Sequence, residues 1–396
     1  MSPERELLIA CARTSVDPQG QERIRVLVQG RPDWSHLIQL ARLHGTRPFL
    51  YRVLSTTCAG LVPSDVWRQL QGHYCAVALQ NARMTRALVD VVEVLRTHAI
   101  AALPLKGPAL AALANGTTLR EFGDLDVLIR KQDVNHAIDA LLRSGFVSRS
   151  DTSANASDRR DRKYHLLERQ SDGIHVDLQW RIASKDYSFS LEHEAFWERP
   201  HPILLSGRTI PGLSPEATLL VLCIHGSKHL WSRLKWVCDV AELLRGSSSI
   251  DWDRTFRMAA ELHCTRMLLL GSTLARDLLD APMPGPVLDR AGKHATVRRM
   301  AARYARALRM GEEPQEASQR NVADYLLLRD RGQDRLRYLL HLCRTLAPGD
   351  RAQLPLLPMS SRAVFYTLLP FRLIATRVVR ARRMKAALAG WLEHMG

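Results

Sequence analysis

The sequence predicts an α+β fold, in which a mixed β-sheet core with helices is flanked by helical N- and C-terminal regions. Two observations indicate the helical regions. Apolar residues recur at helical spacing through residues 1–98, and helix-like runs return after residue 213. Between them, residues 99–211 alternate short apolar runs with helix-like runs, and this alternation indicates a sheet packed with helices. A chain of 396 residues is long enough for two or three domains with a sizeable core.

Residues 1–98 are expected to form a helical N-terminal region that serves packing. Pro63-Ser64-Asp65 is a helix start signal, and the apolar spacing from Val66 to about Leu95 predicts one long helix. Pro18-Gln19-Gly20 and the run 30–33 mark breaks between shorter, earlier helices.

Residues 99–212 are expected to contain the sheet. The predicted strands are Ile100–Leu105, Asp124–Ile129, Phe146–Ser148, Tyr164–Glu168 and Gly173–Arg181, the last two forming a hairpin around Ser171-Asp172-Gly173. Helices are expected over Pro108–Ala114 and Gln132–Ser144. Ser150–Lys163 is polar and without periodicity, so it is interpreted as an exposed loop, either a plain insertion or a segment that touches an acceptor.

Composition narrows the class of protein only in part. No apolar run approaches the length of a bilayer span, so we expect a protein that is not transmembrane and, by default, cytoplasmic. The seven scattered cysteines form no Cys-x-x-Cys pair and are expected to be mostly buried free thiols. The net charge of +16 favours a polyanionic partner, although the basic residues are spread widely.

The chemistry in the sequence centres on Asp124 and Asp126. Residues two apart in a strand project from the same face, so these carboxylates are expected to lie side by side. At roughly 5 Å and an effective dielectric constant of about 20, two such charges repel by about 3 kcal/mol. A bound cation offsets this repulsion, and oxygen ligands suit Mg²⁺ or Mn²⁺. A solvated turn is the alternative interpretation of an isolated Asp-x-Asp.

Lys106-Gly107 follows the first predicted strand and precedes a predicted helix. This order directs a lysine and a helix N-terminus toward the carboxylates, and both favour a phosphate group. The sequence therefore predicts a site for a metal-bound triphosphate.

In these motifs the chain resembles the bacterial uncharacterised nucleotidyltransferases of the DNA polymerase beta-like superfamily. The resemblance rests on Leu105-Lys106-Gly107 and on the run from Arg120 to Ile129, which match the pattern Leu-Lys-Gly, helix, Arg-x-x-x-Asp-x-Asp-x-Leu-Val. It is strong over about residues 100–240 and loose elsewhere. Lys-Gly replaces the Gly-Ser that is typical of the wider superfamily.

The resemblance implies roles for further residues. Asp177, on the predicted strand with His175 and Gln179, matches the third carboxylate, which would share the metal and orient or deprotonate the acceptor hydroxyl. Lys228, in a His-x-x-Lys-His motif, would face the triphosphate across the cleft. Lys106 and Gly107 would cradle the triphosphate. Arg120 would either do the same or brace the loop before the metal strand.

Several residues near Lys228 keep alternative interpretations. His225 and His229 have the spacing of a zinc pair, but no third ligand is apparent nearby and the lysine would repel a cation. The roles of these histidines and of His175 stay open. Trp231 and Trp236 could stack a base, although core packing is the commoner use of such residues. Asp239 is expected to pair with one of the nearby basic side chains.

The expected domains are a helical region over 1–98, a nucleotidyltransferase core over 99–212, a helical domain completing the cleft over 213–345, and a loop with a basic amphipathic segment over 346–396. Phe365–Trp391 could contact RNA or an anionic membrane surface, or could pack ordinarily with a solvated face.

The predicted function is a metal-dependent nucleotidyltransferase, which moves a nucleoside monophosphate from an NTP, such as ATP, to an acceptor hydroxyl and releases pyrophosphate. The acceptor, whether a small molecule, RNA or protein, is not specified by the sequence. A non-catalytic nucleotide- or RNA-binding module is the first alternative. A partner-modifying protein of a biosynthetic or toxin–antitoxin operon is the second.

Overall fold

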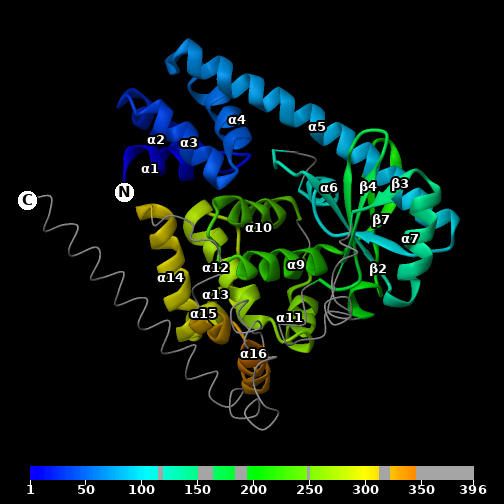
Figure 1. Cartoon of the computed structure of the whole chain (residues 1–396). Coiled ribbons are helices and arrows are strands. Elements are labelled where there is room, and N and C mark those ends of the chain that lie inside the picture. The colour runs from blue at the N-terminus through cyan, green and yellow to red at the C-terminus, as the bar shows by residue number, and fades with distance from the viewer. Residues whose placement is uncertain (115–118, 150–163, 183–193, 248–249, 312–321, 345–396) are drawn as a thin grey trace, which may run out of the picture. The chain divides into compact units, whose positions relative to one another are not determined.

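A computed structural model describes residues 1–114, 119–149, 164–182, 194–247, 250–311 and 322–344 (Figure 1). The chain divides into two compact units, residues 1–185 with 189–330, and residues 186–188 with 331–396. Within the second unit, the described element is α16 (Gly332–Arg344). The expected loop Ser150–Lys163 and the basic segment Phe365–Trp391 lie outside the described residues.

The N-terminal region is helical, as predicted. It contains α1 (Pro3–Cys11), α2 (Pro18–Gln29), α3 (Trp34–His44), α4 (Arg47–Thr57), the short 3₁₀ helix η1 (Ala59–Leu61) and α5 (Ser64–Thr97). The side chains of Asp17 and Asp33 cap α2 and α3 by accepting backbone N–H groups three residues on. The long helix predicted from Ser64 is confirmed as α5, which has 34 residues.

A five-stranded mixed sheet follows. Its strands are β1 (Ala102–Pro104), β2 (Asp124–Ile129), β3 (Phe146–Ser148), β4 (Tyr164–Arg169) and β5 (His175–Gln179), in the order β1-β2-β5-β4-β3. Only the central pair, β2 with β5, is parallel, and the other neighbours are antiparallel. The interspersed helices are α6 (Pro108–Leu113), η2 (Lys131–Asp133) and α7 (Val134–Arg143). The predicted α+β class with a mixed sheet is therefore confirmed.

A second sheet, which was not predicted from the sequence, is formed by the hairpin β6 (His201–Leu205) and β7 (Arg208–Gly212). Ser206 and Gly207 connect its strands, and both have positive φ values, 47° and 75°. Two-residue turns of this kind match the twist of a hairpin, so Ser-Gly between two short apolar runs was the available signal.

The hydrophobic core beneath the sheet determines which side chains face the opposite side. Leu125, Val127 and Ile129 of β2 enter a buried cluster with Val176 and Leu178 of β5 and with apolar residues of α5 and α7. Because side chains alternate along a strand, the residues between them project from the other face. In Figure 1, α7 lies on one side of the strands and α9 (Pro215–Lys228) on the other.

After the sheets the chain is helical. In addition to α9, the helices are α10 (Leu234–Gly246), α11 (Trp252–Glu261), α12 (Thr265–Leu279), α13 (Gly285–Lys293), α14 (Ala295–Met310) and α15 (Val322–Leu327). α12 packs against α9, α10 and α14. Among the helices that the structure describes, none combines the length and apolar character that a membrane span requires. The boundaries of the four regions expected from the sequence stay a prediction.

Candidate active site

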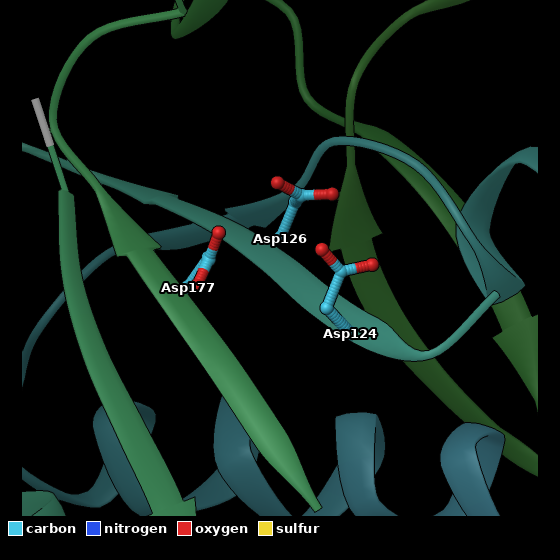
Figure 2. Close-up of side chains that lie close together, drawn as sticks. All are labelled: Asp124, Asp126 and Asp177. Atoms are coloured by element: carbon cyan, nitrogen blue, oxygen red, sulfur yellow. The ribbon is translucent and has the colours of Figure 1, made fainter. Parts of the chain in front are cut away.

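Three aspartates from neighbouring strands meet on the face of the sheet that is turned away from the core. Asp124 and Asp126 project from β2, and Asp177 of β5 is the register partner of Asp126. Each contributes a carboxylate oxygen to a group in which the oxygens lie within 4.8 Å of one another (Figure 2). The parallel pairing of β2 with β5 therefore brings the three predicted carboxylates together.

The environment differs between these carboxylates. Asp126 is buried, with 7% exposure, whereas Asp177 is half-buried and Asp124 is exposed. Carboxylates this close repel one another, by about 3 kcal/mol for each pair at roughly 5 Å and an effective dielectric constant of about 20. An oxygen-only set of this kind fits a hard divalent cation such as Mg²⁺ or Mn²⁺.

Two side chains compensate Asp126 directly. Lys106 places its Nζ 2.8 Å from Oδ2, and the Gln179 side-chain amide donates a hydrogen bond to Oδ1. Each carboxylate oxygen has two lone pairs, so Asp126 keeps acceptor capacity after both contacts. Gln179 was not among the site residues predicted from the sequence. The available signal was its position on the same strand face as Asp177, two residues further on.

Lys106 reaches Asp126 from a loop whose backbone is anchored to β2. The Leu105 N–H donates to the Asp126 carbonyl oxygen over 3.0 Å. Gly107 adopts φ 63° and ψ −124°, a conformation that disfavours any residue with a Cβ atom. Because α6 has only six residues and begins with Pro108, which lacks an N–H, the lysine contributes more positive character here than the helix dipole.

The facing wall comes from α9. Val221, Ile224, His225 and Lys228 line a pocket of about 170 Å³ together with Lys106 and the three aspartates. Burial lowers the pKa of His225 well below its usual value, and the cations Lys106, Arg120 and Lys228 and the neighbouring His229 lower it further. His225 is therefore neutral at pH 7. Lys228 and Lys106 supply the positive charge in the pocket.

Arg120 does not line this pocket. Its Nε lies 3.0 Å from Asp239 Oδ1 on α10, and its carbonyl oxygen accepts a hydrogen bond from Asn81 of α5. The expected pairing of Asp239 with a cation is thus present. Burial raises the pKa of Asp239, and Arg120 and Lys235 oppose that rise. Arg120 thus contacts α10 and α5 from the loop before β2, and its role toward the triphosphate or in bracing this loop stays a prediction.

The tryptophans and the other two histidines named in the sequence contact neighbouring side chains or are buried in the core. Trp231 is 1% exposed and Trp236 is also buried, so core packing is confirmed for both. The His229 ring stacks on Trp236, with 4.6 Å between centroids. His175 lies beside Asp124 in the strand register and pairs with Glu168 of β4 over 3.3 Å.

One comparison with known proteins gives a match over more than half of the chain. A family model described as uncharacterised nucleotidyltransferase matches residues 30–280. None of the curated proteins matches the chain significantly. The antibiotic-resistance factor ANT(2'')-Ia, known from a solution structure, shares 12% sequence identity over 46% of this chain and 91% of its own, with a TM-score of 0.32. A likeness at that TM-score is too weak to bear on fold or function.

Proposed function

We propose that this chain, which belongs to the uncharacterised nucleotidyltransferase family, moves a nucleoside monophosphate from an NTP to an acceptor hydroxyl and releases pyrophosphate. The observation that carries this proposal is the juxtaposition of Asp124, Asp126 and Asp177 beside two lysines in one pocket. Carboxylate oxygens that can hold a cation and lysines that can pair with phosphate together suit a metal-bound triphosphate.

In this proposal the three aspartates hold the divalent cation. When bound, Mg²⁺ or Mn²⁺ would neutralise phosphate charge and favour ionisation of the acceptor hydroxyl. Asp177 is half-buried beside the other two carboxylates, and in this proposal its carboxylate would orient that hydroxyl and accept its proton. No described contact selects the base of the NTP or the class of acceptor.

The two lysines would pair with phosphate oxygens from different elements. Lys228, on the facing helix, would stabilise the charge that develops on the departing pyrophosphate. Lys106 and the Gly107 backbone would hold the triphosphate near β2. His225 stays neutral and so adds no charge, but it can donate or accept one hydrogen bond in the pocket wall.

The test is pyrophosphate release and transfer of label from each of the four NTPs, with Mg²⁺ or Mn²⁺ and host extract as the source of acceptor. Asp124→Asn, Asp126→Asn and Asp177→Asn should each lower transfer by about 10²–10³-fold, because each removes charge that holds the cation. Thermal unfolding should show that the variants remain folded. Full transfer by all three variants would exclude this metal site. Nucleotide binding without transfer would favour a binding module.

A further inference from the structure

Asp126 is contacted by two groups of different character. Lys106, on the loop after β1, brings a positive charge on a flexible four-carbon stem, with 14% of its side chain exposed. Gln179 brings a neutral amide from the rigid neighbouring strand β5 and is 5% exposed. The two contacts use different oxygens of the carboxylate, Oδ2 and Oδ1. Asp126 is therefore held from two sides at once.

A divalent cation at the three aspartates affects these contacts unequally. The Lys106 ammonium and the cation carry charge of the same sign and compete for the same carboxylate, so they repel one another at this distance. The Gln179 amide carries no net charge, so its hydrogen bond to Asp126 is compatible with a cation on the carboxylate. Hydrogen-bond partners of this kind orient metal ligands in many proteins.

The pocket offers the Lys106 ammonium a second position, away from Asp126. It lines the same pocket as Lys228, and the proposed triphosphate would occupy the space between them. An ammonium that leaves Asp126 can pair with phosphate oxygens without leaving the pocket, because its stem has four rotatable bonds.

We propose that Gln179 is the permanent positioning residue of Asp126, whereas Lys106 is an exchangeable counter-ion that neutralises Asp126 until a divalent cation binds and then pairs with phosphate. This inference rests on the proposed function for its second half. Its first half, competition between Lys106 and the cation, requires only that the aspartates bind metal.

The test is direct binding of Mn²⁺ without nucleotide, measured by electron paramagnetic resonance of the free ion. Lys106→Met should bind Mn²⁺ at least about tenfold more tightly than the wild type, because a competing positive charge is gone. Lys106→Gln is the second neutral variant and should do the same. Lys106→Arg keeps the charge and should stay near the wild-type affinity.

Gln179→Met keeps the length of the side chain and removes the N–H donor. It should bind Mn²⁺ about 10–100-fold more weakly, the range typical of lost support for a metal ligand. Lys228→Met is the matched control, since this lysine shares the pocket but no ion pair joins it to Asp126 among the contacts described. Its gain in Mn²⁺ affinity should be smaller than that of Lys106→Met.

A measurement of nucleotide binding tests the second half of the proposal, the pairing of Lys106 with phosphate, separately from the first half. With Mn²⁺ saturating, Lys106→Met should bind a non-hydrolysable NTP analogue about tenfold or more weakly, despite its higher metal affinity. Unchanged or weaker Mn²⁺ binding by both neutral Lys106 variants, or no saturable binding to any variant, would overturn the inference. If the Mn²⁺ pattern holds but no label is ever transferred, the proposed function fails and the competition stands. If label transfer depends on metal while the neutral variants match the wild type, only the inference fails.

Discussion

Two histidines, His44 and the pocket residue His225, are kept neutral by burial. His44, at the end of α3, accepts a hydrogen bond from the Leu234 N–H at the start of α10, over 3.2 Å. Burial lowers its pKa from 6.5 to about 4, and nearby Arg5 and Arg233 act in the same direction. Protonation of His44 would replace the acceptor lone pair with a second N–H and break this contact.

This pKa makes folding stability depend on pH in a defined direction. Above about pH 6.5, His44 is neutral in both states and adds no pH dependence. As the pH falls from 6.5 toward 4, the unfolded chain takes up a proton that the folded chain does not, so stability falls by about 3 kcal/mol. His225 contributes in the same direction.

His44→Gln should therefore flatten the loss of stability between pH 6.5 and 4, while retaining a side chain that can accept from Leu234. The measurement is the free energy of urea unfolding at several pH values. His201→Gln, at an exposed position of β6, is the control and should keep the wild-type slope. Equal slopes for wild type and His44→Gln would contradict the assignment.

At the scale of elements, the C-terminal end of α9 positions Lys228. The chain leaves this helix through Leu230 and Trp231, both left-handed with φ near 50°. That conformation costs about 1–2 kcal/mol per residue. Burial of the Trp231 ring removes roughly 150–250 Å² from water, worth about 4–6 kcal/mol at about 25 cal/mol per Å². The buried ring therefore outweighs the cost and defines how α9 ends.

Two glycines make room for this ring. A Cβ atom at Gly226 would lie 2.5 Å from the Trp231 ring, and one at Gly271 of α12 would lie 2.6 Å from Cys223 Sγ and 2.8 Å from that ring. Helix propensity alone would favour alanine at such positions by about 1 kcal/mol. The close contacts reverse that preference.

Gly226→Ala should lower the free energy of unfolding by about 1–3 kcal/mol, the usual cost of overpacking. Gly72→Ala is the matched control, since Gly72 lies within α5 and no atom would lie within 4 Å of its Cβ. That change should stabilise the protein by up to about 1 kcal/mol. Denaturant unfolding of both variants measures the difference. A Gly226→Ala variant as stable as the control would refute the packing argument.

On the scale of the whole molecule, a charged network joins the N-terminal helices, the loop before β2 and α10. Arg120 pairs with Asp239 of α10, while Glu121 pairs with His73 of α5 and Arg47 of α4. The Arg120–Asp239 pair is well shielded, at 15% and 6% side-chain exposure. Removal of one partner from such a pair leaves an uncompensated charge and typically costs about 3–5 kcal/mol.

A double-mutant cycle tests this coupling. Arg120→Met and Asp239→Leu should each destabilise the protein by about 3–5 kcal/mol, and the double variant should lose clearly less than the sum. The exposed Arg149–Glu168 pair is the control, with an expected coupling of about 1 kcal/mol or less. If Arg120→Met instead weakened NTP use at full stability, Arg120 would belong to the triphosphate site.

Local sequence patterns were sufficient to predict most of the elements and the chemical character of the site. The strand from Asp124 to Ile129, the long helix from Ser64 and the hairpin arms before and after Asp172 followed from local periodicity and turn residues, because these depend on neighbours along the chain. Alternation along a strand was sufficient to place Asp124 and Asp126 on one face. The matching family motif then pointed to Asp177.

Contacts between groups that are distant in the sequence became visible only in the folded chain. Parallel pairing of β2 with β5 brings Asp177 opposite Asp126 and places Gln179 within reach of the same carboxylate. The association of Lys106 with Asp126, and of Arg120 with Asp239, depends on how loops and helices distant in sequence pack together. Side-chain pairing between elements distant in sequence depends on how they pack around the shared core, and local periodicity alone did not specify these contacts.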